Sequence, residues 1–262
     1  MQALRRPWGM MHFAETGPKD GPMVVFGNSL GTELRLWDGL LPHLPEGLRL
    51  VRYDKPGHGL SDLADSISIQ SLADDAAALI DHLGGSRAVY VGLSIGGLIG
   101  QSLAALRPDL LTGLVLSNTA AKIGTAESWQ ARIAAVEAQG LGNLADGILE
   151  RWFSPGFRTQ PEIAIWRNML SRTPAPGYVA ACRAIAAADQ SNATSGLALP
   201  VLAIGGSLDG STPPELVAAT AKLVKGSRFE VLDGAGHLPF VEQPRQYAHL
   251  LAGFFRECGH EA

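Results

Sequence analysis

The sequence predicts an α/β fold, in which helices cover both faces of a mostly parallel central sheet. Short, continuously apolar stretches such as Met23–Phe26 are typical of strands buried on both faces. Between such strands lie helical patterns such as Ile69–Leu83, in which an apolar stripe recurs every three or four positions. This alternation favours a parallel sheet, and 262 residues lie within the range of α/β folds that build one sheet.

The first half of the chain supplies most of the predicted sheet. The turn-rich segment Gly17–Pro22 between the first two strands suggests an opening hairpin. Loops rich in glycine follow several of the later strands and are expected at the edge of the sheet where ligands bind. The expected strands are Met11–Glu15, Met23–Gly27, Leu48–Tyr53, a strand beginning at Ala88 and Thr112–Ser117, and the expected helices are Leu34–Leu41, Ile69–Leu83 and Leu98–Leu106.

The alternation changes between positions 120 and 192, where helical patterns follow one another without a convincing strand. We expect a helical cap at residues 120–192 that folds over the site and excludes water. The sheet core would comprise residues 1–119 and 193–262. The expected cap helices are Ala126–Gln139, Leu144–Trp152, Pro161–Leu170 and Tyr178–Ala188, and the core resumes with a strand at Pro200–Gly206, a helix ending at Leu223, a strand at Arg228–Leu232 and a helix at Pro244–Cys258.

Charge, hydropathy and cysteine content exclude several classes of function. A net charge of −4 without a basic run argues against a nucleic-acid partner. No stretch approaches the length of a membrane span and Met1–Thr16 lacks a signal-peptide core, so we expect a soluble, cytoplasmic protein without a membrane partner. Cys182 and Cys258 lie in no metal-ligand spacing, so we expect free thiols, with a disulfide as the alternative. Neither a metal nor a cofactor is expected.

The segment Gly92–Gly96 fits the G-x-S-x-G pattern of a nucleophile elbow. In such a turn a serine is held in a strained conformation between a strand and a helix, and small neighbours leave its hydroxyl exposed. The helix that begins near Ile95 would direct its free N–H groups at the same point. Ser94 is therefore a candidate nucleophile, and the alternative is a tight turn whose glycines serve packing.

Two distant residues supply the partners that a serine nucleophile requires. The serine needs a base to accept its proton, and the base needs an acid that orients it. Asp209 follows one predicted strand, and His237 lies in a glycine-flanked loop after the next. The rival acid position, after an earlier strand, is Asn118, which cannot carry a charge. Ser94, Asp209 and His237 are therefore the predicted catalytic triad.

The loop Gly27–Thr32 is expected at the same edge of the sheet as the elbow. Backbone N–H groups of Leu30 and Ile95 would then face each other as an oxyanion hole, in which each donor is typically worth about 10²–10³ in rate. The alternative is a plain loop that enters the next helix. Asp54 and His58 lie in the following Gly/Pro loop, and we expect them to cap and brace that loop.

The expected cap contains aromatic and cationic candidates for substrate binding. Trp129 and Arg132 lie three positions apart and share one face of a predicted helix. They would offer an aromatic wall and a guanidinium fork for a carboxylate. Arg151 and Trp152 are further candidates. The alternatives are arginines in solvent and tryptophans that form the core of the insert itself.

Several motifs carry a resemblance to a known family. They are Gly27–Thr32, Arg52–Asp54 with Gly57–Ser61, Gly92–Gly97 and Gly234–His237, and in the insert Glu150–Pro155, Gly177–Tyr178 and Ala187–Asp189. With these motifs the chain resembles the α/β-hydrolase superfamily over its full length and, more narrowly, the 3-oxoadipate enol-lactonases. Two positions depart from the superfamily pattern: Gly27–Ser29 replaces the frequent His-Gly, which suits the lactonases, and Pro56 replaces a small residue or arginine.

The resemblance implies an α/β-hydrolase fold and an enzyme that hydrolyses 3-oxoadipate enol-lactone to 3-oxoadipate in the β-ketoadipate pathway. Its partner would be a small lactone or ester. A cation would bind the free carboxylate of the substrate, with Arg132 as the first candidate and Arg151 as the second. The alternatives are another esterase or lactonase, a cofactor-free perhydrolase, and a non-catalytic protein that binds a small ligand.

Overall fold

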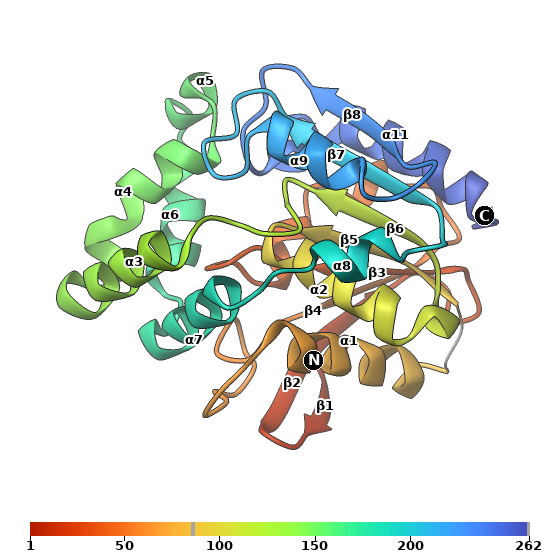
Figure 1. Ribbon diagram of the computed structural model, residues 1–262, viewed down its shortest axis with the longest axis horizontal. Coiled ribbons are helices and arrows are strands. Elements are labelled where there is room, and N and C mark those ends of the chain that lie inside the picture. Colours follow the sequence, from red (N-terminus) through yellow and green to blue (C-terminus); the bar gives the residue numbers. More distant parts are fainter. Residues whose placement is uncertain (85–86, 261–262) are drawn as a thin grey trace.

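The structure is a computed structural model that describes residues 1–84 and 87–260, so residues 85, 86, 261 and 262 of the expected core lie outside it. Its centre is an eight-stranded sheet with the order β1-β2-β4-β3-β5-β6-β7-β8 (Figure 1). The strands are β1 (Gln2–Arg6), β2 (Gly9–Thr16), β3 (Met23–Gly27), β4 (Arg49–Tyr53), β5 (Ala88–Leu93), β6 (Leu111–Ser117), β7 (Val201–Gly206) and β8 (Arg228–Leu232).

The sheet is mostly parallel, as predicted, because the pairs β1–β2 and β2–β4 are antiparallel and the other five pairs are parallel. The predicted opening hairpin between Met11–Glu15 and Met23–Gly27 is wrong. Instead β2 pairs with β1 and β4, and β4 lies between β2 and β3. Strand β1 is absent from the prediction because this edge strand is largely exposed and contains two arginines rather than an apolar run.

Helices cover both faces of the sheet. The helical elements are η1 (Leu34–Trp37), η2 (Leu41–His43), α1 (Ile69–His82), α2 (Ile95–Leu106), η3 (Pro108–Leu110), α3 (Ala126–Gln139), α4 (Leu141–Trp152), α5 (Pro155–Arg158), α6 (Ile163–Ser171), α7 (Ala175–Ala186), α8 (Ser191–Ser195), α9 (Pro214–Ala221), α10 (Pro239–Glu242) and α11 (Pro244–Glu257). In β6, Gly113 lies against Phe254 of α11, whereas Leu114 lies against Gly100 of α2. Successive residues of a strand point to opposite faces, so α2 and α11 cover opposite sides.

The helix expected at Leu34–Leu41 is replaced by the two short 3-10 helices η1 and η2. Gly39 falls between them and Pro42 opens the second, so a continuous α-helix is disfavoured. Among residues 1–84 and 87–260, no helix is long and apolar enough to cross a membrane. Cys182 and Cys258 are free thiols, as expected.

Between β6 and β7 the chain forms the helices α3 to α8. We call α3 to α7 the insert helices; they lie beside one end of the sheet, while α8 lies over the sheet (Figure 1). Two main-chain contacts join α4 to loops that follow β7 and β8. Gly210 N–H donates to the Arg151 carbonyl at 3.2 Å, and His237 N–H donates to the Trp152 carbonyl at 2.8 Å. The insert helices therefore contact the edge of the sheet where the parallel strands end.

Candidate active site

Ser94 occupies a strained turn between β5 and α2. Its backbone angles are φ 57° and ψ −118°, a conformation that residues with a side chain rarely adopt. A Cβ at Gly92 would lie 2.3 Å from the Gly96 carbonyl oxygen, and one at Gly96 would lie 2.2 Å from the Gly27 carbonyl oxygen. Only glycine fits at both positions, so the G-x-S-x-G pattern is a steric requirement of this turn.

Asp209 and His237 meet at the same edge of the sheet. Both side chains are buried, and His237 Nδ1 lies 2.8 Å from Asp209 Oδ2. With Nδ1 as the proton donor in this hydrogen bond, Nε2 of the neutral imidazole carries the lone pair that can accept a proton. Among the hydrogen bonds of the described residues, none joins the Ser94 hydroxyl to His237. Such contacts are often long before substrate binds.

The Asp209 carboxylate receives further hydrogen bonds that the sequence did not predict. Asn118 Nδ2 donates to Oδ2 at 2.9 Å, and the Thr212 hydroxyl donates to the same oxygen at 2.8 Å. The N–H groups of Ser211 and Thr212 donate to Oδ1 at 2.7 and 3.0 Å. Burial alone would raise the pKa of Asp209, but His237, Asn118 and these N–H groups outweigh it and lower the pKa. The acid is therefore held in its charged form.

The proposed oxyanion donors lie on elements that touch. Gly27 and Gly92 are register partners in β3 and β5, and the start of α2 packs against the Gly27 carbonyl. Ile95 N–H is at the first position of α2, where helical N–H groups lack intrahelical acceptors. Among the described residues, neither Leu30 N–H nor Ile95 N–H donates a hydrogen bond. Both donors are therefore free to bind an oxyanion.

Asp54 and His58 brace loops, as the sequence suggested. The Asp54 carboxylate accepts hydrogen bonds from Leu34 N–H at 2.7 Å and Leu60 N–H at 3.1 Å, and it lies 2.8 Å from His12 Nδ1. His58 Nε2 accepts a hydrogen bond from Gly31 N–H at 3.2 Å. These buried groups fix the loop that carries one proposed oxyanion donor.

The insert helices place two arginines near one phenol. Tyr178 of α7 is buried, and its ring would lie 3.1 Å from a Cβ at Gly31 in the loop Gly27–Thr32, which carries the proposed donor Leu30 and is called the oxyanion loop below. Arg132 Nη1 lies 3.5 Å from the Tyr178 hydroxyl. Burial and then Cys182 raise the pKa of Tyr178 to about 12, whereas the charges of Arg132 and Arg151 oppose that shift. Arg132 therefore lies beside this phenol.

Arg151 also contacts the loop of the triad acid. Its Nε donates to the Gly210 carbonyl at 3.0 Å, directly after Asp209. Its side chain keeps contact with solvent, yet partial burial and then the charge of Arg132 lower its pKa, and Asp209 raises it. The two arginines thus lie near enough to repel each other. An anion bound between them would relieve this repulsion.

The two predicted tryptophans have other described contacts. The half-buried Trp129 indole N–H donates to the Ile123 carbonyl at 2.6 Å, which ties α3 to the loop before it. Trp152 is buried and its ring lies edge-on to that of Phe153. Its carbonyl holds His237 N–H. In the structure the polar contacts of both residues therefore support neighbouring loops, and Tyr178 occupies the place beside the oxyanion loop.

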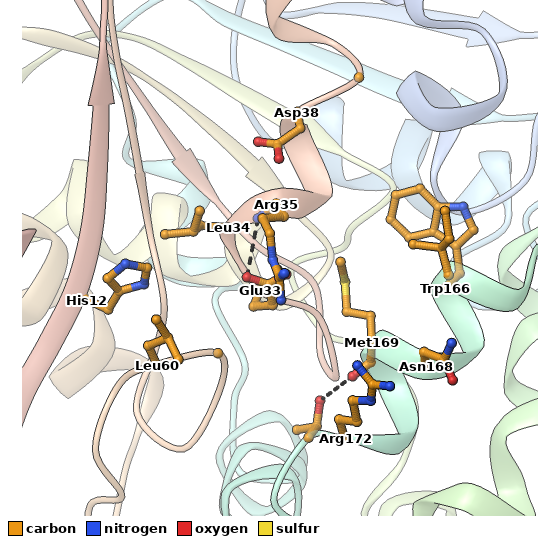
Figure 2. A pocket seen from close by; sticks show the side chains of 14 residues that line it. His12, Glu33, Leu34, Arg35, Asp38, Leu60, Trp166, Asn168, Met169 and Arg172 are labelled. Atoms are coloured by element: carbon orange, nitrogen blue, oxygen red, sulfur yellow. Dashed lines mark hydrogen bonds and ion pairs between the residues drawn. The ribbon is translucent and has the colours of Figure 1, made fainter. Parts of the chain in front are cut away.

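A pocket of about 800 Å³ lies outside the predicted triad. Figure 2 shows His12 and Leu60 on one side of it and Trp166 and Met169 of α6 on the other. The described residues that line this pocket do not include Ser94, Asp209 or His237. The pocket touches the oxyanion loop from the outside, because its lining residue Thr173 donates a hydrogen bond to the Gly31 carbonyl at 3.3 Å.

Sequence reasoning missed Asn118, Thr212 and Tyr178. Asn118 cannot serve as the acid, but its φ of 44° and its place after β6 suit an asparagine that hydrogen-bonds a neighbour. Thr212 follows Asp209 by three residues, a spacing typical of an aspartate that accepts from the following loop. Tyr178 had only its place in a motif shared with the lactonases as a signal.

Comparisons with known proteins agree with the geometry. The family model described as alpha/beta hydrolase fold matches residues 22–244. The chain is 36% identical over 242 residues to 3-oxoadipate enol-lactonase 1 of Acinetobacter baylyi, covering 92% of this chain and 91% of that protein. It is 37% identical over 244 residues to 3-oxoadipate enol-lactonase 2 of the same organism, with the same coverage.

A solved structure gives the same result. The crystal structure of the enol-lactonase from Burkholderia xenovorans LB400 has a TM-score of 0.91 and 33% sequence identity. The likeness covers 94% of this chain and 96% of that chain. Because the family model and these relatives extend over most of the sequence, the chain belongs to the α/β-hydrolase fold family and is a hydrolase similar to the enol-lactonases.

Proposed function

We propose that this protein is a serine hydrolase that opens 3-oxoadipate enol-lactone to 3-oxoadipate. The observation that supports the choice of substrate is a pair of arginines, with Arg132 beside Tyr178 and Arg151 beside the loop of Asp209. An enol-lactone with a free carboxylate matches such a site, because the carboxylate needs cations while the ring needs a nucleophile. The relatives named enol-lactonases support the same choice.

The reaction would proceed through an acyl-enzyme. His237 Nε2 takes the proton of the Ser94 hydroxyl as its oxygen attacks the lactone carbonyl, and the N–H groups of Leu30 and Ile95 bind the oxyanion. Collapse of this intermediate breaks the ring C–O bond and expels an enolate. The His237 imidazolium gives its proton to this enolate, directly or through water, so that the enolate becomes the ketone and His237 is neutral again. Asp209 keeps the imidazole in the required tautomer and stabilises the imidazolium.

Water then completes the cycle. His237 removes a proton from a water molecule, whose oxygen attacks the acyl-enzyme carbonyl at the same oxyanion site, and the Ser94 oxygen leaves with a proton from His237. We infer that residues 120–192 act as a cap over a core formed by residues 1–119 and 193–262. In this arrangement the core performs the chemistry and the cap selects the substrate by its charge.

The direct experiment is an assay with enol-lactone generated enzymatically and used at once. We expect kcat/KM for this anionic lactone to exceed that for a neutral five-membered lactone or a p-nitrophenyl ester by at least about 100-fold, because one well-placed ion pair can contribute several kcal/mol. Ser94→Ala serves as the blank for spontaneous ring opening. Equal values for the anionic and the neutral substrates would refute the assignment of the enol-lactone.

A further inference from the structure

Lys55 is a buried cation that the triad mechanism does not use. It follows Asp54 in the loop after β4, and only 2% of it is exposed. Its Nζ donates to the Ser29 carbonyl at 2.6 Å and to the Thr32 carbonyl at 3.3 Å. Burying an ammonium group costs stability even when it is hydrogen-bonded. Stability alone therefore does not explain why a lysine occupies this position.

The position of the first of these hydrogen bonds is informative. The Ser29 carbonyl and the Leu30 N–H belong to one peptide group, which is planar and directs the two in opposite directions. An ammonium group fixed on the carbonyl side therefore fixes the direction of the N–H. It also polarises the peptide, because a hydrogen bond accepted by a carbonyl strengthens the N–H of the same group as a donor.

The next peptide is held as well. Gly31 N–H donates to His58 Nε2 at 3.2 Å, and His58 Nδ1 lies 3.1 Å from the Pro56 carbonyl. These contacts require a neutral imidazole that donates through Nδ1 and accepts through Nε2. Burial, and then the positive charge of Lys55, lower the pKa of His58 well below its ordinary value. Leu30 thus lies between two restrained peptide groups, and the first of them carries its N–H.

We propose that Lys55 is a positioning residue of the oxyanion hole, which holds and polarises the Ser29–Leu30 peptide so that Leu30 N–H points at the acyl oxygen. The inference rests on the proposed role of Leu30, but any ester attacked by Ser94 would use the same donor. Failure of the enol-lactone assay would therefore leave the test below intact, and the two proposals can fail separately.

The charges around Lys55 give the proposal a pH signature. Asp54 on its own loop and Glu33 at the start of η1 raise the pKa of Lys55, but burial outweighs them and lowers it to about 7. His58 stays neutral, and His12 of β2 reaches the group only through Asp54. Above pH 7 the ammonium becomes an amine, which is a weaker donor, so the rate of acylation should fall to a lower plateau.

Stability should change in the opposite direction. A lysine whose pKa is lowered by folding binds its proton more tightly in the unfolded chain, so its charge destabilises the folded protein below its folded pKa. That cost disappears as pH rises from about 7 towards the ordinary lysine value of 10.5. A purely structural lysine would instead stabilise the fold at neutral pH. Rate and stability therefore distinguish the two roles.

The test compares Lys55→Met with Lys19→Met, a control at an exposed lysine, using a neutral p-nitrophenyl ester. For Lys55→Met we expect kcat to fall by about 10–100-fold, a part of the value of one oxyanion donor, with KM within about threefold. The inhibition constant of phenylboronic acid, which forms a tetrahedral anion on serine, should rise by a similar factor. The melting temperature at pH 7 should not fall, and Lys19→Met should behave as wild type.

A second measurement follows the pH dependence of the wild type and of Lys55→Met. The wild-type burst of p-nitrophenol should slow with an alkaline pKa near 7 and approach the rate of Lys55→Met, which should lack that transition. The proposal is overturned if Lys55→Met keeps kcat within twofold of wild type, or if the alkaline transition persists in that variant. A loss of kcat with a raised KM and a lower melting temperature would also overturn it, since that pattern describes a disordered loop.

Discussion

The loops at the carboxyl edge of the sheet and the insert helices are held by different contacts. The edge loops bury Asp54, Lys55 and Asp209, and hydrogen bonds from several chain segments satisfy these charged groups. The ion pairs of the insert helices, such as Arg167–Asp146 and Arg183–Glu137, lie in solvent. Exposed pairs of this kind contribute at most about 1 kcal/mol each.

This difference separates two tasks. Buried, fully bonded groups fix donor and acceptor directions, which the chemistry at Ser94 requires. The insert is held mainly by apolar packing, for example of Ile133, Ile148 and Leu149, and it contributes side chains rather than a rigid polar frame. The edge loops should therefore govern kcat for every substrate, whereas the insert helices should govern the choice among substrates.

The largest effect is expected at the edge. Ser94→Ala removes the proposed nucleophile and should lower kcat for a p-nitrophenyl ester by at least about 10³-fold, because the remaining groups cannot form an acyl-enzyme. Mass spectrometry should also find no labelling by a serine-directed phosphonate. Wild-type labelling in a folded Ser94→Ala protein would place the nucleophile elsewhere and remove the basis of the comparison.

A smaller effect at the edge is expected from Thr212→Val, which removes the hydroxyl donor to Asp209 without changing the shape of the side chain. The loss should lower the free energy of unfolding at pH 7 by about 1–3 kcal/mol, whereas Thr212→Ser should keep most of it. The lowered pKa of Asp209 means that its stabilising effect is present above the ordinary carboxyl pKa and is lost as pH falls through the folded value.

The gap between Thr212→Val and wild type should therefore shrink as pH falls below about 4, the ordinary aspartate range. Thermal unfolding of both variants between pH 3 and 7 measures it. A difference in unfolding free energy that stays constant across this range would mean that the Thr212 hydroxyl does not act through the charge of Asp209. Charged groups would then stabilise the edge loops less than we infer.

The smallest effect is expected in the pocket of Figure 2. Trp166→Ala enlarges a pocket that the triad does not line, so kcat and KM for a neutral ester should change by no more than about twofold. A tenfold rise in KM would place this pocket on the path of the substrate. The division between edge loops and insert would then have to include α6 in the catalytic region.

The sequence predicted the edge of the sheet better than the insert. Ser94 and Asp209 follow strands with clear apolar runs, His237 follows a strand of alternating pattern, and the strained turn at Ser94 requires glycines that the sequence shows directly. Asp209 and His237 meet as expected because β7 and β8 are neighbours in the sheet. The predicted pairing of the first strands was wrong, because the exposed strand β1 lacks the apolar residues that would identify it.

The partners of the insert helices were harder to predict. Helical periodicity located α3 at its observed bounds, but it says nothing about which residue of another helix faces Arg132. Tyr178 comes from α7, far along the chain, and reaches Arg132 only through tertiary packing. The hydrogen bonds of Lys55 could not be predicted for the same reason, because they join two loops more than 20 residues apart in the chain.

The most direct test of the proposed division is the ratio of kcat/KM for enol-lactone to kcat/KM for a neutral ester, measured in wild type and in the double variant Arg132→Ala/Arg151→Ala. We expect this ratio to fall by about 100-fold or more, with the neutral ester changed by less than about threefold. An equal loss on both substrates, or no loss on either, would contradict the claim that the edge performs the chemistry and the insert selects the anion.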